Sequence, residues 1–366
     1  MPGKPVASRA RRAEATLREK VAWLTDPRHY PGRPRAVEVI ETHFAWVFLA
    51  GARAYKLKKP LRQAAMDHRT LARRERACRE ELRLNRRLAP DVYLRVLPLY
   101  RRPGGSLSLR RPLAPGLRIA DWLVEMRRLA AARMLDRIIA RGGVRAIDLD
   151  RLTARLASFY QQAQRRPSTD GAYRRRLSRE IRRNADELCA QDLGLSRRRV
   201  IPLARAQHEF LDRGRAAFAG RGPRLVDGHG DLRPEHVFLG SSVLGVRVID
   251  CLEFDRGLRW LDPAEEIAFL ALECARLGAS AVAQALIVRY RHVAGDPVPQ
   301  ALIHFYMSRR AALKAQIAAW HLRDPAFAGH RRAWKARAQS YLADAARHIK
   351  RAAALQGASR RSARHA

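Results

Sequence analysis

The chain has 366 residues, of which 47% are hydrophobic and 30% charged, and this length fits two domains or one bilobal unit. Its 73 Lys and Arg residues outnumber the 35 Asp and Glu residues, so the formal net charge is +38. Even the most apolar stretch, 267–288, contains Glu273 and Arg276, so we expect no membrane-spanning helix, and residues 1–20 lack the apolar core of a secretory signal.

The N-terminal third is predicted to be a small sheet with one long helix. Residues 1–35 form a basic lead-in that contains one helix, and residues 36–126 form a strand-rich lobe. Residues 69–88 carry apolar side chains at helical spacing amid dense charge and end before Pro90, which predicts an amphipathic helix. Runs of β-branched and aromatic residues predict strands at 37–41, 45–50, 53–59, 92–100, 106–113 and 122–126.

The remainder of the chain is predicted to be a mainly helical lobe, residues 127–355, followed by a disordered basic tail at 356–366. One non-helical island, 226–255, interrupts it with two short runs of strand character around the turn GSSVLG. Helices are predicted at 129–141, 148–165, 173–190, 203–219, 263–290, 299–321 and 331–355.

The island carries the strongest chemical signal in the sequence. His229, Gly230 and Asp231 are followed by His236, and Asp250 stands nineteen residues after Asp231 at the end of the second run. A kinase catalytic loop has the form H-R-D-L-x-x-x-N, with a metal-binding Asp after a short hairpin. An isolated HGD would fit a simple tight turn, but the second Asp and the downstream WLDPAEEIAF favour a site for phosphoryl transfer.

These segments resemble the aminoglycoside phosphotransferase family, within the protein-kinase-like fold. The resemblance rests on 229–239 with 248–269, and VIETHFAWVFLAGARAYKLKKP and EELRLNRRLAPDVY narrow it to a bacterial branch. Some members of this branch carry a P-loop ATP-binding domain after the kinase-like part. This sequence contains no G-x-x-x-x-G-K-[ST], so we expect the stand-alone form. The implied fold is α+β and bilobal, with a small β-rich lobe and a large helical lobe.

The resemblance implies ATP and Mg²⁺, with Mn²⁺ as an alternative metal, and assigns roles to individual residues. His229 and Asp231 belong to the catalytic loop, where Asp231 accepts the proton of the attacking hydroxyl group. Asp250 binds the metal. Lys56 or Lys58, on one face of a strand, contacts the nucleotide phosphates, and Glu81 on the next helix orients the lysine. Solvated lysines at a strand end and a surface Glu–Arg pair are the simpler alternatives.

Departures from the family pattern weaken this assignment. The first turn, 41–44, contains no glycine to cover the phosphates, and His236 stands where an Asn would bind metal. Magnesium prefers oxygen ligands, whereas imidazole suits transition metals, so a metal would depend mainly on Asp250, with Glu253 or Glu235 in support.

Two further segments are assigned from the family pattern. Asp262 and Glu266 are expected to brace the catalytic loop by hydrogen bonding. Val124 and Met126 are expected to supply a hinge carbonyl and amide for adenine, unless Asp121 begins a helix there.

The sequence therefore predicts an ATP-dependent phosphotransferase that acts on a hydroxyl group of a small molecule. The missing glycine loop and His236 leave open a nucleotide-binding pseudokinase or regulatory module. The charge alone suggests a nucleic-acid-binding protein, but 65 Arg against eight Lys, scattered along the chain, equally fits a compositional bias. The same charge favours a neutral or anionic acceptor over an aminoglycoside.

The cysteines indicate the cellular compartment of the protein rather than a reaction. Cys78, Cys189, Cys251 and Cys274 show no C-x-x-C spacing, so we expect neither a disulfide framework nor a structural zinc site. A reducing cytoplasm is the location that this cysteine usage predicts. The oligomeric state is left open.

Overall fold

A computed structural model of the chain divides into two compact units. The strand-rich unit comprises residues 1–134 and 247–257, and the helical unit comprises 135–246 and 258–366. Residues 127–134 thus group with the strand-rich unit, as does the segment 247–257, which lies far along the chain from the rest of that unit. The structure describes residues 16–63, 66–110, 115–241, 245–323 and 329–362.

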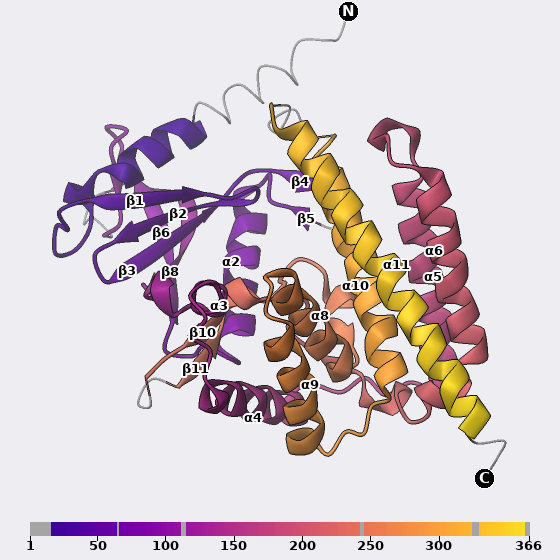
Figure 1. Ribbon diagram of the computed structural model, residues 1–366. Helices are drawn as coiled ribbons and strands as arrows, with labels where there is room; N and C mark the ends of the chain where they lie inside the picture. The colour runs from indigo at the N-terminus through magenta and orange to yellow at the C-terminus, as the bar shows by residue number, and fades with distance from the viewer. Residues whose placement is uncertain (1–15, 64–65, 111–114, 242–244, 324–328, 363–366) are drawn as a thin grey trace, which may run out of the picture. The chain divides into compact units, whose positions relative to one another are not determined.

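The strand-rich unit is built on a six-stranded sheet in the order β1-β2-β3-β8-β6-β7, with every adjacent pair antiparallel (Figure 1). The sheet and its single long helix confirm the predicted N-terminal architecture. The elements are β1 (Val37–Glu41), β2 (Ala45–Ala50), β3 (Arg53–Lys58), α2 (Leu71–Asn85), β6 (Tyr93–Arg101), β7 (Leu107–Ser108) and β8 (Arg118–Arg127), with a small hairpin of β4 (Arg62–Gln63) and β5 (Met66–Asp67) and short 3₁₀ turns at Pro27–His29 and Ala131–Arg133.

Alternation along β3 divides its side chains between the two faces of the sheet. Tyr55 and Leu57 pack into an apolar core with Phe48 and other buried side chains. Ala54 lies on the opposite face in a second core with Cys78 of α2. Lys56 and Lys58 share the parity of Ala54, so β3 presents both lysines to the face that α2 covers.

The segment predicted as a basic lead-in is partly integrated into this unit. Residues 16–25 are helical, and Leu24 is fully buried in the core that contains Tyr55. Lys20 is also buried, and its Nζ donates to Asp121 Oδ2 at 2.7 Å. Arg74 Nε donates to Asp121 Oδ1 at 2.6 Å, so one buried carboxylate joins the N-terminal helix and α2 to β8.

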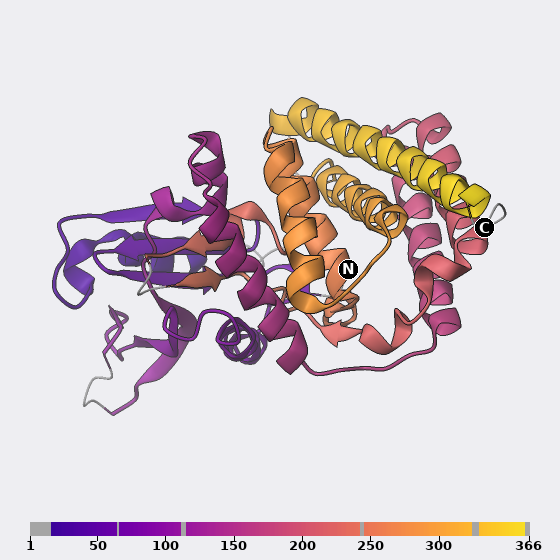
Figure 2. The ribbon, with the colours of Figure 1, turned by 60° about the horizontal axis from the view of Figure 1, so that its bottom comes forward.

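The helical unit contains long helices and a few very short strands. Figures 1 and 2 both show α11 running along α10. Among the described residues, no helix combines the length and apolarity needed to cross a membrane. The elements are α3 (Leu135–Ala140), α4 (Ala146–Gln162), α5 (Asp170–Leu188), α6 (Arg197–Arg213), β9 (Val226–Asp227), β10 (Val237–Leu239), β11 (Val246–Val248), α7 (Arg256–Arg259), β12 (Trp260–Leu261), α8 (Pro263–Arg276), α9 (Ser280–Ala294), α10 (Gln300–Trp320) and α11 (Arg331–Ser362), with 3₁₀ turns at Gln191–Leu193, Arg215–Phe218, Gly222–Arg224 and Pro234–His236; β11 and α7 lie at the boundaries with the strand-rich unit.

Several predicted elements differ in extent from the observed ones. The helix predicted at 263–290 is two helices, because Gly278 adopts a positive φ of 84° that ends α8. The tail predicted to be disordered continues α11 as far as Ser362. The strand predicted at 106–113 is reduced to Leu107–Ser108, and its last part lies outside the described residues.

The shared carboxylate of Asp121 generates a stability prediction. Asp121→Asn leaves Lys20 and Arg74 buried without a countercharge, and breaking a buried ion pair in this way costs about 3–5 kcal/mol. We expect urea denaturation to show a loss of this order. Glu75→Gln is the control, because its exposed i,i+4 pair with Arg79 contributes only about 0.3–0.5 kcal/mol. Equal effects of the two variants would contradict the proposed role of Asp121.

Candidate functional site

The predicted site residues fall into two groups, one in each unit. Lys56, Lys58, Glu81 and Asp250 belong to the strand-rich unit. The loop that contains Asp231 belongs to the helical unit. Each group is built by contacts within its own unit.

The carboxylate of Glu81 is the centre of the first group. Its Oε1 accepts from Lys56 Nζ at 2.8 Å, and its Oε2 accepts from Lys58 Nζ at 2.6 Å. Each lysine also contacts a second acid, because Lys56 Nζ donates to Asp250 Oδ1 at 2.8 Å and Lys58 Nζ donates to Glu253 Oε1 at 2.5 Å. The predicted pairing of Lys56 with Glu81 is therefore present, and Lys58 takes part in the same cluster.

Burial and neighbouring charges have opposite effects on the pKa values in this cluster, and the effect of the charges is the larger. Burial by itself would lower the pKa of Lys56, but Asp250 and Glu81 hold that pKa well above its usual value. Burial would raise the pKa of Glu81, but the two lysines lower it. Lys56, Lys58 and Glu81 are therefore ionised at neutral pH, and the two lysines lie among three acidic side chains, those of Glu81, Asp250 and Glu253.

The two lysines differ in exposure, and this distinguishes their possible roles. The Lys58 side chain is 2% exposed and is enclosed between Glu81 and Glu253. The Lys56 side chain is 16% exposed, and its partner Asp250 is 45% exposed. Lys56 and Asp250 are thus the part of the cluster that a ligand can reach.

The backbone at Asp250 is held in an unusual conformation. Its φ is +61°, in the left-handed region that non-glycine residues seldom adopt, although Asp tolerates it better than most. The N–H of Asp250 donates to the Tyr93 hydroxyl oxygen at 3.1 Å, and the N–H of Cys251 donates to Asn85 Oδ1 at 2.9 Å. Residues held in such regions cluster at functional sites, where surrounding contacts maintain them.

The residues around Asp250 fit a magnesium ion by their chemistry. Asp250 offers a partly exposed carboxylate, and Mg²⁺ typically binds one or two carboxylates while keeping waters or phosphate oxygens. Within the described part of the chain, no three His, Cys, Asp or Glu side chains converge into a complete metal cage. A magnesium ion at Asp250 would therefore take its other ligands from waters or from phosphate oxygens.

The residues predicted to form a hinge for adenine lie inside the six-stranded sheet, and their adenine role stays a prediction. Val124 lies within β8 and is paired with Lys56 on one side and Val96 on the other. Met126 is likewise paired with Ala54 and Tyr93. Their backbone groups are therefore committed to neighbouring strands. Asp121 also belongs to β8, so no helix begins there.

The turn between β1 and β2 is short and contains no glycine, as the sequence showed. Thr42 N–H donates to the Ala45 carbonyl at 2.8 Å, and Ala45 N–H donates to Thr42 Oγ1 at 3.0 Å. The Thr42 side chain therefore stabilises this turn by hydrogen bonding to the backbone of Ala45, and the turn does not need a glycine.

The second group surrounds Asp231 in the helical unit. Arg233 Nε donates to Asp231 Oδ2 at 3.0 Å, and Lys314 Nζ of α10 lies 3.9 Å from Asp231 Oδ1. Burial would raise the pKa of Asp231, but Lys314 and Arg233 hold it well below its usual value. Asp231 is therefore a carboxylate at neutral pH, and its surroundings are cationic.

Glu266 of α8 holds the loop before Asp231. Its carboxylate is fully buried and accepts from the backbone N–H groups of His229, at 3.0 Å, and Gly230. Gly228 lies so close that a Cβ there would stand 2.8 Å from Glu266 Oε2. Asp262 begins α8 by accepting from Ala264 N–H. The predicted hydrogen bonding to the loop is therefore present for Glu266, whereas Asp262 caps α8 and binds Arg221.

The two histidines of the loop are both engaged by protein groups. His229 is fully buried, and its Nδ1 accepts from the N–H of Asp231 at 3.4 Å. His236 Nδ1 contacts the Asp231 carbonyl at 2.9 Å, and its Nε2 lies 3.1 Å from Arg233 Nη2. With a guanidinium donating to Nε2 and a carbonyl accepting at Nδ1, the His236 ring supports the loop backbone. Its predicted role as a metal ligand stays a prediction.

Sequence reasoning missed several residues of both groups. Tyr93, Arg233, Arg310 and Lys314 were not singled out, although Arg310 Nη1 donates to the Gly230 carbonyl at 3.1 Å. The sequence does mark Lys314 as unusual, because it is one of only eight lysines in an arginine-rich chain. Its distance along the chain from Asp231 concealed the contact.

Comparison with known proteins supports the fold and leaves the function open. The chain is 35% identical over 296 residues to the uncharacterized protein Rv2004c of Mycobacterium tuberculosis H37Rv, an alignment that covers 77% of this chain and 54% of the relative. The chain thus spans about half the length of the curated relatives it matches, which include a Mycobacterium bovis protein at the same identity. No family model matches the chain.

Among solved structures, a choline/ethanolamine kinase family protein from Mesorhizobium loti superimposes with a TM-score of 0.50 at 15% identity, covering 93% of this chain and 99% of that one. An aminoglycoside phosphotransferase APH(3'')-Id from Streptomyces rimosus gives a TM-score of 0.47 at 15% identity, over 80% of this chain and 97% of that one. The Mesorhizobium loti structure and the two units together confirm the predicted α+β, protein-kinase-like fold. The comparisons give no support for the resemblance to a branch in which some members carry a P-loop domain.

The cationic surroundings of Asp231 generate a prediction about its titration. Replacing Lys314 by Met removes the cation that lowers the Asp231 pKa most, so the pKa of Asp231 rises. Carbon-13 NMR titration of the aspartate carboxyl groups measures this, with Asp231→Asn to assign the resonance. Lys335→Met, which removes an exposed lysine of α11, is the matched control and should leave the titration unchanged. An Asp231 pKa equal in both Lys variants would contradict the electrostatic role of Lys314.

Proposed function

We propose that this protein is an ATP-dependent phosphotransferase that acts on a hydroxyl group of a small molecule. The observation that carries the proposal is Lys56 Nζ, which is shared at 2.8 Å between Glu81 and the half-exposed carboxylate of Asp250. A lysine–glutamate pair on β3 and the following helix, next to a metal-binding acid, is the phosphate-handling arrangement of kinase chemistry. The protein-kinase-like fold and the loop at Asp231 agree with it.

The proposed reaction needs a base, a phosphate ligand and a metal ligand. The acceptor hydroxyl attacks the γ-phosphorus, the new O–P bond forms, and the bond from the γ-phosphorus to the bridging oxygen breaks to release ADP. Asp231 accepts the hydroxyl proton, because it is ionised and 24% exposed. Lys56 contacts the nucleotide phosphates and Asp250 holds Mg²⁺. The bound metal neutralises charge on the phosphates.

The acceptor is proposed to be neutral or anionic. Lys314, Arg233 and Arg310 all lie near Asp231 or its loop, so the local field opposes a polycation. The described carboxylates from α8 to α11 are also already bonded. The hydrogen-bonded pairs are Glu265 with Arg309, Glu266 with the loop amides, Glu273 with Tyr341, Asp296 with Arg221, and Asp344 with Arg276. Asp324 lies outside the described residues.

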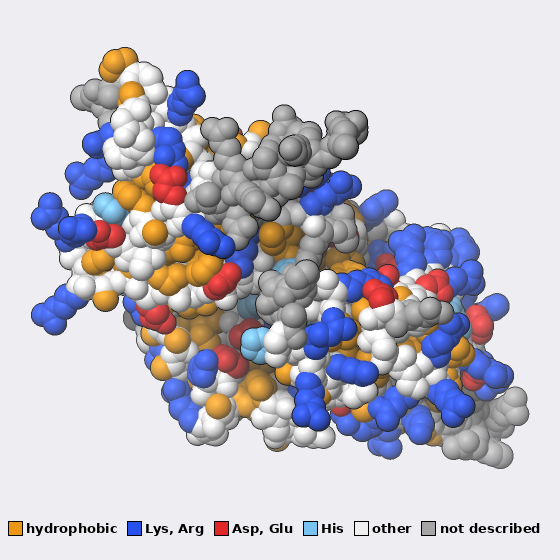
Figure 3. Space-filling view, turned by 90° about the horizontal axis from the view of Figure 1, so that it is seen from above, with side chains coloured by type: hydrophobic (Ala, Val, Ile, Leu, Met, Phe, Trp, Pro, Cys, Tyr) orange, Lys and Arg blue, Asp and Glu red, His pale blue; other side chains and the backbone are white. Residues whose placement is uncertain are grey.

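The high positive charge does not by itself indicate a nucleic-acid partner. Figure 3 shows Lys and Arg side chains at many separate places on one face, interspersed with acidic and apolar side chains. A nucleic-acid-binding surface concentrates its cations in a patch or stripe. We therefore propose a compositional origin for much of the charge, and a shallow salt dependence of nucleic-acid binding would agree with it.

The separation of roles between the two acids gives the central functional test. Asp250→Asn should weaken magnesium-dependent ATP binding at least about tenfold, a change of about 1.4 kcal/mol. Asp231→Asn should bind ATP like the wild type but lower turnover by about 10²–10⁴-fold, the usual contribution of a general base. Calorimetric titration with ATP and Mg²⁺, together with a turnover assay, measures both effects.

Asp150→Asn, which alters an exposed acid paired with Arg289, serves as the control and should change neither quantity. If the Asp250→Asn variant binds ATP with the affinity of the wild type, Asp250 is not the magnesium ligand. ATP binding without turnover under any acceptor would instead favour the regulatory module motivated by His236 and the glycine-free turn.

The acceptor proposal has its own test. Steady-state assays with several aminoglycosides should give kcat/KM below the usual enzyme range of ~10⁴–10⁸ M⁻¹s⁻¹. The physical reason is repulsion of a polycation by Lys314 and its neighbours together with the absence of an unbonded acidic cluster among the described residues of α8–α11. A value within that range for any aminoglycoside overturns the proposal.

A further inference from the structure

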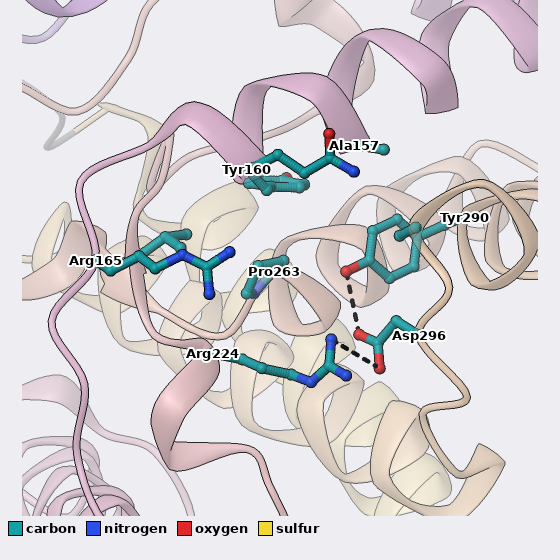
Figure 4. Close-up of a pocket in the computed structure, with 10 residues that line it drawn as sticks. Ala157, Tyr160, Arg165, Arg224, Pro263, Tyr290 and Asp296 are labelled. Carbon is teal, nitrogen blue, oxygen red and sulfur yellow. Dashed lines mark hydrogen bonds and ion pairs between the residues drawn. The ribbon is translucent and has the colours of Figure 1, made fainter.

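The helical unit contains a pocket that the proposed function does not use. It has a volume of about 230 Å³ and lies between α4, α9 and the segment that leads into β9 (Figure 4). None of its lining residues belongs to the loop from His229 to His236. It is lined by Ala157, Tyr160, Gln161, Arg165, Arg224, Val226, Pro263, Tyr290, Ala294 and Asp296.

The polar side of this pocket has a surplus of positive charge. Asp296 is buried and already binds Arg221, whose Nη1 donates to Asp296 Oδ1 at 2.5 Å, while Arg221 also binds Asp262. Arg224 Nη1 lies 3.8 Å from Asp296 Oδ1 with its side chain 44% exposed. Arg165 is exposed and has no ion pair with any described carboxylate. Among the side chains that line the pocket, two guanidinium groups, those of Arg165 and Arg224, are thus present with one carboxylate, that of Asp296.

The remaining walls are apolar and aromatic. The rings of Tyr160 and Tyr290 meet edge to face with their centroids 6.4 Å apart, and Pro263 lies between α4 and Arg224 in Figure 4. Figure 4 also shows the guanidinium groups of Arg165 and Arg224 extending toward the space bounded by these side chains. Aromatic walls beside two guanidinium groups suit a ligand that joins an anionic group to a small ring.

Two walls of the pocket are connected to the Asp231 loop. Tyr160 donates its hydroxyl to Glu266 Oε2 at 3.0 Å, the same oxygen that accepts from the N–H of His229 at 3.0 Å. Val226 belongs to β9, which pairs with β12 and leads within a few residues to His229. A ligand that packs on Tyr160 and Val226 therefore touches the supports of the loop without touching the loop itself.

From these contacts we propose that the pocket is a binding site for a small organic anion, a phosphate ester or carboxylate on a small ring, and that its occupancy stabilises the segment from Val226 to Asp231. Arg165 and Arg224 bind the anionic group, and Tyr160, Tyr290 and Pro263 contact the ring. The pocket shares no lining residue with the loop from His229 to His236, so its ligand is distinct from the nucleotide and the acceptor of the proposed reaction. Through Tyr160 and Val226 that ligand acts on the loop as a regulator.

Phenyl phosphate is a suitable probe for the test, because it carries both chemical features. Isothermal titration calorimetry of the full chain should show saturable binding at one site, and phenol, which lacks the charge, should bind at least tenfold more weakly. Arg165→Gln and Arg224→Gln should each raise the dissociation constant about tenfold. Ala294→Trp keeps both guanidinium groups but fills the pocket, and it should abolish binding.

Arg198→Gln, which removes an exposed arginine of α6 that does not line the pocket, is the matched control and should bind like the wild type. Hydrogen exchange of a peptide spanning Val226–Asp231 should slow when phenyl phosphate is bound and remain unchanged in Ala294→Trp. Equal binding by Arg165→Gln, Ala294→Trp and Arg198→Gln would overturn the site. Binding at the site with no change in exchange would overturn its connection to the loop.

Discussion

The strand-rich unit depends on one buried carboxylate shared by two lysines. Glu81 is completely buried, and an unpaired charge in that position would be strongly destabilising, so α2 must present it where β3 presents Lys56 and Lys58. Each lysine then needs a second countercharge, which Asp250 and Glu253 supply. This requirement explains why residues 247–257 belong to the strand-rich unit although most of the surrounding sequence belongs to the helical one.

The helical unit uses a different solution to hold its loop. Glu266 accepts from backbone amides instead of side-chain cations, and burial raises its pKa even as those hydrogen bonds favour the ionised form. A carboxylate that accepts from successive N–H groups determines the path of the backbone before Asp231. The Asp231 carboxylate is paired with the cationic side chains of Arg233 and Lys314, so it stays ionised. The backbone of the loop is held separately by Glu266.

Arginine is used inside this protein as well as on its surface. Arg221 and Arg259 are buried, and each forms an ion pair with an acid of the helical unit, Asp262 and Asp227 respectively. A planar guanidinium satisfies two carboxylates at once, as Arg221 does for Asp262 and Asp296. Many of the acidic side chains are therefore already bound to arginines inside the protein. Exposed arginines such as Arg165, in the pocket between α4 and α9, are then available to bind anions.

The sequence by itself predicted most of the long strands and helices and singled out Asp231, Asp250, Lys56 and Glu81 as candidate site residues, because periodicity and short motifs are local properties of the chain. It did not determine the split at Gly278, the helical end of α11 or the integration of residues 16–25, since packing overrides local preference there. It predicted the strand that contains Val124 and Met126, but not that this strand lies between β3 and β6 in the sheet. Only the tertiary structure decided the contacts of Lys314 with Asp231 and of Lys20 with Asp121, because ion pairs between distant segments depend on how helices and strands pack, and no local pattern records that.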